Sequence, residues 1–388
     1  AVRTAENVIL TDEGGFSRRP TEALRGTLPG AHSLWKSRTG LVLCAAGTSL
    51  YQVALGNPTT FTELFIGLDQ GVAVSYTDAG AKVYFTTPSV LGKITSGGLV
   101  RRPGVADLTG ARPTAVATTG GMFPGRYGVA YSLTNDLGEE SGLSNVSWVE
   151  LADIGGILLS GVMGATDVTK INVYVTAANG EVRYLHSSQT WTGAPAIRDA
   201  SLGRSASKIG RMPMPAGQIV RFYNGRLYVA QGRFIYVSDP FDRGLCDVRS
   251  GWIVAAKRVT LLEPVRDGLY VGDSTRVMFY AGDGPETFKL QPAHNHPAIE
   301  GTGATVAADF FDAERVPDQS TPVAAWLSDC GLVIGRPDGV VIPAQVERVA
   351  LASESYGWGS FVGGAGVSQG IFAVEGMVVG TEEPADTL

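Results

Sequence analysis

Short runs of β-branched and aromatic residues, separated by pairs of turn-forming residues, recur along most of this chain. The pattern is clearest between positions 217 and 290, where it occurs twice. The first copy places Asn224-Gly225 before runs at 226–230 and 233–237, and the second places Asp267-Gly268 before runs at 269–271 and 276–280. Asn-Gly and Asp-Gly favour hairpin turns because both central residues must tolerate positive φ. The sequence therefore predicts a meandering antiparallel sheet here, and little helix anywhere, since no segment sustains a 3.6-residue apolar stripe.

Similar patterns begin at Gly40 and Gly80 before this region and at Gly331 and Gly370 after it. The spacing is 40 residues from Gly40 to Gly80, 43 from Gly225 to Gly268, and 39 from Gly331 to Gly370. Four-stranded propeller blades recur roughly every 40 to 50 residues. The spacing of 63 from Gly268 to Gly331 predicts a long loop within 291–322. The spacing of 145 from Gly80 to Gly225 predicts an inserted domain.

The inserted region, residues 110–205, is expected to form a small β-sandwich. Runs typical of strands lie at 126–133, 156–160, 170–176 and 182–186, and short strands at such intervals are typical of sandwiches. The fold class expected is therefore all-β: a β-propeller formed by the N- and C-terminal segments, with an inserted fibronectin-III/Ig-like β-sandwich. Residues 1–109 would hold an N-terminal arm and the first blades, and residues 206–388 the remaining blades.

Composition narrows the class of protein. The chain has 388 residues, a formal net charge of -6, and 18% charged residues, which argues against wrapping nucleic acid, since phosphate binding needs clustered Lys and Arg. No apolar run is long enough to predict a membrane span, and no charged-then-apolar leader opens the sequence. Cys44, Cys246 and Cys330 are interpreted as small buried hydrophobes of a chain made in a reducing cytoplasm.

Two stretches resemble known bacteriophage proteins. The succession "GRYGVAYSLTNDLGEESGLSN … INVYVTAANGEVRYLHS" is similar to the fibronectin-III-like domain of phage tail structural proteins. The flanking "AENVILTDEGGFSRRP" and "NGRLYVAQGRFIYVSDP … DGLYVGDSTRVMFYAGDGPETFKL" resemble the propeller portion of nozzle or hub proteins of short-tailed phages. The resemblance covers most of the chain and includes no catalytic signature.

This resemblance implies a virion protein of the tail, made in the host cytoplasm and present as a homo-oligomer, expected to be a sixfold ring around the tail channel. Its partners would be other tail or head-to-tail adaptor proteins, with transient passage of DNA and no specific binding of it. Acidic residues lining the lumen would repel DNA; the candidates are Asp239, Asp242, Asp247, Asp283 and Glu286. The basic N-terminal arm, which contains Arg18-Arg19-Pro20, is either a solvated terminus or a contact with the next subunit.

The chain contains one closely spaced histidine pair, His294-Asn295-His296. Residues two apart on a strand face the same side, so both rings could bind one metal. The close carboxylates along the sequence are Asp309, Asp312 and Glu314, and they do not complete a tetrahedral set. A polar loop or interface patch is therefore favoured over a metal site, and no metal is expected.

No motif predicts catalysis. The stretch from Ser75 to Gly80 approaches the turn of sialidase-type propellers but has one residue too many, and 301–306 lacks the third glycine of a dinucleotide-binding loop. No enzyme activity and no cofactor are expected. The alternative function is a receptor- or glycan-binding propeller at the tail tip, which would use exposed aromatic rings. The tryptophans that could serve it, interpreted otherwise as core, are Trp35, Trp148, Trp191, Trp252, Trp326 and Trp358.

Overall fold

The computed structural model describes residues 26–343, apart from 57, 192–194, 312, 313 and 315, together with the backbone of four strands outside that range. The described residues form β-strands and one 3-10 turn, η1 (Ala308–Phe310), and no α-helix. No helix in these ranges is long and apolar enough to cross a membrane. The all-β prediction is therefore confirmed.

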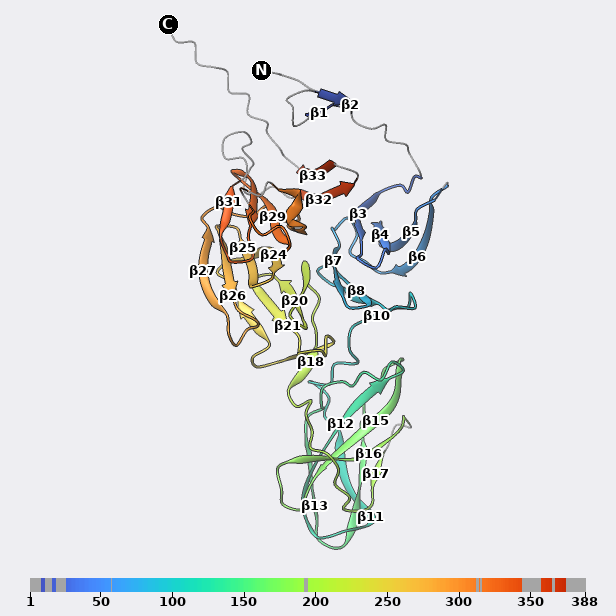
Figure 1. Cartoon of the computed structure of the whole chain (residues 1–388). Coiled ribbons are helices and arrows are strands. Elements are labelled where there is room, and N and C mark those ends of the chain that lie inside the picture. The colour runs from blue at the N-terminus through green and yellow to red at the C-terminus, as the bar shows by residue number, and fades with distance from the viewer. Residues whose placement is uncertain are drawn as a thin grey trace.

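Five four-stranded antiparallel sheets hold most of the chain, and all but the third, which skips β22, are built from consecutive strands (Figure 1). Two precede the middle region: β3 (Ala31–Lys36), β4 (Val42–Ala46), β5 (Ser49–Ala54) and β6 (Thr60–Ile66); then β7 (Ser75–Ala79), β8 (Lys82–Thr86), β9 (Leu91–Ile94) and β10 (Val100–Arg101). The third and fourth are β19 (Ile219–Tyr223), β20 (Arg226–Gln231), β21 (Phe234–Val237) and β23 (Trp252–Val254); then β24 (Val259–Val265), β25 (Gly268–Asp273), β26 (Val277–Ala281) and β27 (Lys289–His294). The fifth is β28 (Ala304–Val306), β29 (Val323–Ser328), β30 (Gly331–Gly335) and β31 (Val341–Pro343).

The first strands of these sheets lie beside one another and share a repeat of 42 residues. Arg221 of β19 bonds Glu263 of β24, 42 residues on, and Thr305 of β28 bonds Glu263 from a further 42 residues on. Ser33 of β3, which accepts a hydrogen bond from the Val74 N–H, precedes Ser75 of β7 by the same interval. Arg221 of β19 also donates a hydrogen bond to Ser75 of β7, which is 146 residues earlier. One repeat accounts for 42 of these residues, so an additional 104 lie between the second and third sheets. The repeat is therefore interrupted once, between the second and third sheets.

The interrupting segment forms two facing sheets of its own, here called the two-sheet unit. One sheet contains β11 (Thr114–Met122), β14 (Gly155–Ser160) and β17 (Ala196–Ile197); the other contains β13 (Ser147–Leu151), β12 (Gly125–Asn135), β15 (Val168–Thr176) and β16 (Arg183–Thr190). Tyr131, Ile157 and Val173 belong to one buried core that the two sheets enclose. Four of these strands match the runs expected from sequence, and the unit lies at the end of the molecule away from the five sheets (Figure 1).

Val105 and Leu108 also pack into this core, although both precede the expected start at residue 110. The return to the repeat is made through β18 (Arg211–Pro213), which pairs with β22 (Leu245–Asp247). Two further hairpins lie near the chain ends: β1 (Val8–Leu10) with β2 (Phe16–Arg18), and β32 (Gly357–Gly364) with β33 (Val367–Val374). The side chains of the arm, including Arg18, Arg19 and Pro20, lie outside the described residues.

Two of the predicted turns differ in an instructive way. Asn224 and Gly225 have φ of 43° and 81° and form the two-residue loop between β19 and β20, as predicted. In the second copy the loop residues are Arg266 and Asp267, and Gly268 is the first residue of β25. A Cβ on Gly268 would lie 2.3 Å from the Tyr280 carbonyl oxygen and 2.8 Å from the Phe279 ring. This glycine is therefore required by close packing, and the prediction of an Asp-Gly turn is wrong by one residue.

The unequal spacing around Gly331 has a related cause. Gly40, Gly80 and Gly225 lie between the first and second strands of a sheet, and Gly268 begins the second strand of its sheet, whereas Gly331 begins a third strand, after the turn that follows the second. The first turn of the fifth sheet is instead the long connection 307–322 between β28 and β29, and the short strand β28 was not predicted. The expected long loop is thus present, but it occupies only part of 291–322.

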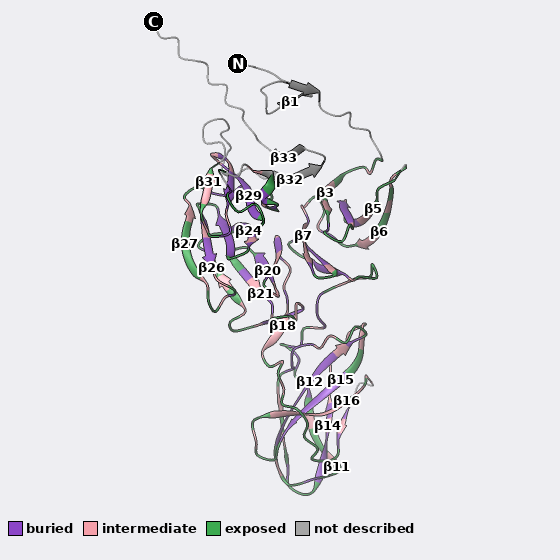
Figure 2. Ribbon diagram, viewed as in Figure 1, coloured by how far each residue is buried: buried purple, intermediate pink, exposed green. Residues whose placement is uncertain are grey.

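Burial follows the middle strands of each sheet, whereas the outer strands β6 and β27 are largely exposed (Figure 2). Apolar residues of the recurring runs, which strand alternation predicts to be core, are buried, with exposures from 0% to 4%: Leu227, Tyr228, Val229, Leu269, Val271 and Val333. The equivalent residue of the run after Gly370, Phe372, lies outside the residues whose side chains are described. Cys44 and Cys246 are buried as predicted, and burial raises the pKa of the Cys246 thiol to about 12. Cys330 is only half-buried, so its interpretation as a core residue is wrong.

Candidate functional sites

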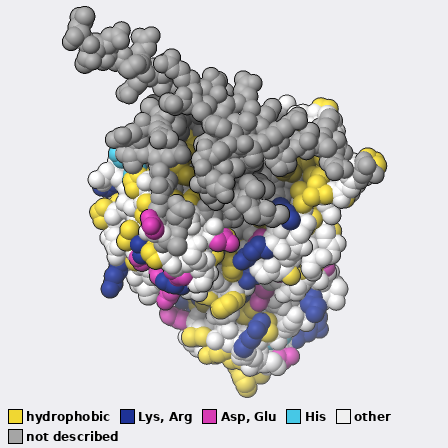
Figure 3. All heavy atoms as spheres, turned by 45° about the horizontal axis from the view of Figure 1, so that its top comes forward, with side chains coloured by type: hydrophobic (Ala, Val, Ile, Leu, Met, Phe, Trp, Pro, Cys, Tyr) yellow, Lys and Arg dark blue, Asp and Glu magenta, His cyan; other side chains and the backbone are white. Residues whose placement is uncertain are grey.

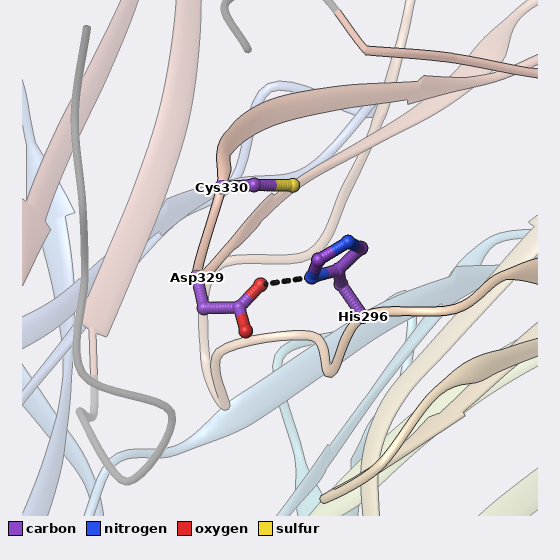
Figure 4. A group of neighbouring side chains, drawn as sticks. All are labelled: His296, Asp329 and Cys330. Carbon is purple, nitrogen blue, oxygen red and sulfur yellow. Dashed lines mark ion pairs between the residues drawn. The ribbon is translucent and has the colours of Figure 1, made fainter. Parts of the chain in front are cut away.

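A cluster of metal-binding side chain types lies where β27 ends against the turn between β29 and β30 (Figure 4). His294 is the last residue of β27 and His296 follows it, and their ring centroids are 5.1 Å apart, so the two rings do share one side of the chain. Asp329 and Cys330 form the two-residue turn between β29 and β30. The fold therefore brings the histidine pair to a thiol and a carboxylate that are more than thirty residues away in sequence.

The distances within this cluster are short. The Cys330 Sγ lies 3.6 Å from the His294 Nε2, and the His296 Nδ1 lies 2.9 Å from the Asp329 Oδ1. The donor atoms of His296, Asp329 and Cys330 are all within 4.8 Å of one another. The pKa of His294 is lowered mainly by burial and, to a smaller extent, by the neighbouring His296. Both effects favour the neutral form of the His294 imidazole.

The carboxylates expected beside the histidine pair are not the ones found there. Of the three, Asp312 lies outside the described residues, and the grouped donors include neither Asp309 nor Glu314. Sequence proximity is a poor guide here because the packing of the sheets brings the β29–β30 turn beside His296. An Asp-Cys pair directly before Gly331, where one copy of the recurring pattern begins, was the signal in the sequence that could have pointed to these ligands.

Most of the acidic residues proposed to face a lumen form ion pairs with a lysine or an arginine. Four lie in ion pairs: Asp239 and Asp247 with Arg211, Asp242 with Lys208, and Glu286 with Arg226. For Asp283, the backbone carbonyl accepts a hydrogen bond from the Asn224 amide. Paired carboxylates carry little net field. Four of the five candidate side chains therefore have a base beside them.

Most of these pairs lie near β18, where the chain returns from the two-sheet unit to the repeat. A cavity of about 150 Å³ there is lined by Arg211, Arg226, Asp239, Asp247 and Glu286, among others. The Arg211 Nε donates to the Asp239 Oδ2 at 2.6 Å and its Nη1 donates to Asp247. Each charged group in this set has an opposite charge beside it, which is typical of a structural network.

A second charged contact joins the two-sheet unit to the sheet of β7–β10. Lys93 of β9 is fully buried and donates to Glu139 in the two-sheet unit. Burial lowers the pKa of Lys93, while the Glu139 carboxylate opposes this shift. The neighbouring Glu140 accepts a hydrogen bond from the Tyr174 hydroxyl at 2.7 Å, and burial raises the pKa of Tyr174 to about 12.

The two remaining sequence motifs, 75–80 and 301–306, make contacts that hold neighbouring strands together. Asp78, in the stretch that approaches a sialidase turn, accepts a hydrogen bond from the Arg38 N–H at 2.8 Å and so ties β7 to the neighbouring sheet. The glycine-containing segment 301–306 leads into β28, where a Cβ on Gly303 would lie 2.8 Å from the Glu263 Oε1.

The tryptophans divide between core and surface. Trp326 is fully buried, Trp35 stacks on Tyr76, and Trp191 packs on the core of the two-sheet unit. Trp148 and Trp252 are exposed by 42% and 40%. The side chain of Trp358 lies outside the described residues.

Comparison with known proteins does not identify the chain. No protein-family model and no curated protein sequence matches it. Among solved structures it is similar to the crystal structure of Citrobacter koseri AztD, with 11% sequence identity, a TM-score of 0.29, and coverage of 81% of this chain and 86% of that one. A likeness this low carries no argument about fold or function, so the function must be argued from this chain's own residues.

Proposed function

We propose that this chain is a structural protein of a bacteriophage tail, a component of the nozzle or hub that forms part of the conduit for DNA ejection. The observation that carries the proposal is the 42-residue repeat of hydrogen-bonded first strands, interrupted once by the two-sheet unit. This is the order of parts that the resemblance to tail nozzle proteins implies. The role is mechanical, and no reaction is assigned to it.

In this proposal the five four-stranded sheets are blades of a β-propeller, and their first strands surround its axis. The strand β32 lies against β28, the first strand of the fifth sheet, which supports a further blade after the fifth. Closing the ring of blades would cover the edges of the first strands, which otherwise invite pairing with other chains. The two-sheet unit is then the fibronectin-III-like sandwich projecting from the propeller.

The surface charges fit a protein that DNA passes without adhering to it. On the face shown in Figure 3, acidic and basic side chains are interspersed, and no large basic patch stands out. With a net charge of -6, such a surface offers little of the clustered positive charge that holds DNA phosphates. Identical copies joined head to tail would close a ring, and six is the number that the resemblance implies.

The test is a cryo-electron microscopy reconstruction of the phage particle that carries this chain. We expect a ring of six copies around the tail channel, with each two-sheet unit projecting and neighbouring tail proteins above and below. A three-fold spike, or absence of the chain from the particle, would contradict the proposal. Antibody labelling of intact particles with a monoclonal antibody to the two-sheet unit gives an independent check of the tail position.

A receptor- or glycan-binding role is the second candidate, because two aromatic rings lie exposed together. Trp252 of β23 and Phe234 of β21 meet edge to face at 6.0 Å, and they are 40% and 38% exposed. Exposed rings of this kind can stack on sugars. Saturable binding on a glycan array that Trp252→Ala abolishes and Trp148→Ala leaves unchanged would favour this role over the first.

A further inference from the structure

The cluster at the end of β27 has the donor spacing of a metal centre. In a tetrahedral zinc site, with bonds of about 2.0 Å to nitrogen and 2.3 Å to sulfur, two ligand atoms are roughly 3.3 to 3.5 Å apart. The 3.6 Å between the His294 Nε2 and the Cys330 Sγ is close to that spacing. The donors of His296, Asp329 and Cys330 all lie within 4.8 Å of one another.

A second observation concerns the Asp329 carboxylate. Its Oδ1 is buried and accepts no hydrogen bond, although the His296 Nδ1 is 2.9 Å away. A buried carboxylate oxygen without a partner is costly. The His296 nitrogen and this oxygen converge to 2.9 Å without the geometry of a hydrogen bond, and a cation held between them would satisfy both atoms.

We propose that His294, His296, Asp329 and Cys330 form a binding site for one transition-metal cation of the zinc class. The donor set selects this class: imidazole and thiolate suit zinc and its neighbours, whereas magnesium and calcium prefer oxygen ligands. On binding, the Cys330 thiol loses its proton to solvent and the thiolate becomes a ligand.

The site joins two neighbouring sheets of the repeat. Its histidines come from the end of β27 in the fourth sheet, and Asp329 and Cys330 come from the β29–β30 turn of the fifth. A bound cation would therefore fasten these sheets to each other and stabilise the folded chain. This inference does not rest on the proposed function.

The first experiment uses the purified full-length chain, stripped of metal with a chelator and then titrated with Zn²⁺ or Co²⁺. We expect one equivalent to bind, the Co²⁺ form to show a thiolate-to-cobalt charge-transfer band and tetrahedral visible bands, and the melting temperature to rise with Zn²⁺ but not with Mg²⁺. The band would report on Cys330, because Cys44 and Cys246 are 3% and 0% exposed. No binding of either metal would show that His296 and Asp329 form only an ion pair, and would overturn the proposal.

Variants locate the site. Cys330→Ser should abolish the charge-transfer band, and His296→Gln should weaken Zn²⁺ binding by more than about tenfold, the loss that even an outer-shell partner can produce. The matched controls are His186→Gln in the two-sheet unit and Asp283→Asn, which should bind as the wild type does. Melting in the presence of chelator establishes that each variant is folded. A charge-transfer band that persists in folded Cys330→Ser would refute the assignment.

Discussion

At the scale of single residues, Leu269 shows how tightly the sheets pack against each other. It is 1% exposed and belongs to a core that includes Tyr228 and Ile235 of the third sheet and Val271 of its own strand. Successive side chains of a strand point to opposite faces, and both faces of these middle strands are covered. A residue such as Leu269 therefore has no contact with solvent to which a charge could turn.

We predict that Leu269→Asp unfolds or aggregates the protein. Losing a buried leucine side chain costs about 3 to 5 kcal/mol, and the new carboxylate adds the penalty of an unpaired charge. The measurement is thermal unfolding followed by circular dichroism. Leu290→Asp, at a side chain 59% exposed on β27, is the matched control and should melt near the wild type. A wild-type melting temperature for Leu269→Asp would contradict the packing described here.

At the scale of elements, the first strands are joined by a polar network as well as by apolar packing. The Arg221 Nε donates to the Glu263 Oε1 at 2.9 Å, and its Nη1 donates to the Ser75 Oγ at the same distance. Thr305 donates to the other Glu263 oxygen at 3.2 Å. The Glu263 side chain is 1% exposed and the Arg221 side chain 18%. One ion pair thus links β7, β19, β24 and β28.

Glu263→Gln tests this network. It leaves the Arg221 charge without its counterion, and breaking such a buried pair costs about 3 to 5 kcal/mol. We expect denaturant unfolding to show a loss near the lower end of that range, because Arg221 keeps some contact with solvent. Glu286→Gln removes the same charge from a pair in which the carboxylate is 67% exposed, and should cost less than about 1 kcal/mol. Equal losses in the two variants would mean that the network does not hold the strands together.

At the scale of the whole molecule, the two-sheet unit is a separate body with its own core. Its ties to the five sheets are largely ionic: Lys93 with Glu139, Arg101 with Asp136, and Arg102 with Asp167. Its apolar core extends to Val105 and Leu108 on the incoming side. Removing residues 110–205 would leave these two side chains without the core against which they pack.

We therefore predict that a deletion that includes Val105 and Leu108 leaves a more stable protein than a shorter deletion that retains them. Deleting 103–209 with a short Gly-Ser linker should leave a soluble, β-rich protein that unfolds cooperatively, because the five sheets keep their own cores. Joining Thr109 to Ala206 should give a lower melting temperature, since it exposes both residues. An unfolded chain from the longer excision would show that the repeat depends on the insert.

The local pattern was informative because strand and turn preferences act over a few residues. Alternating apolar runs located the strands around Leu227 and Val271, and Asn224-Gly225 located a hairpin turn. Gly268 was misread because the same residue type serves two purposes, positive φ and close packing, and only the neighbouring Phe279 and Tyr280 distinguish them. The strand β28 was missed because three residues are too few to show a period.

The sequence by itself determined the all-β class, the approximate repeat length and the presence of an insert, since each depends on the order of short apolar runs and turns. Tertiary structure alone decided that His294 meets Cys330, that Glu263 is bonded to both Arg221 and Thr305, and that Asp239 and Asp247 are paired with Arg211. These contacts join residues 28 to 42 positions apart. They depend on how whole sheets are placed beside one another, and no local preference specifies that placement.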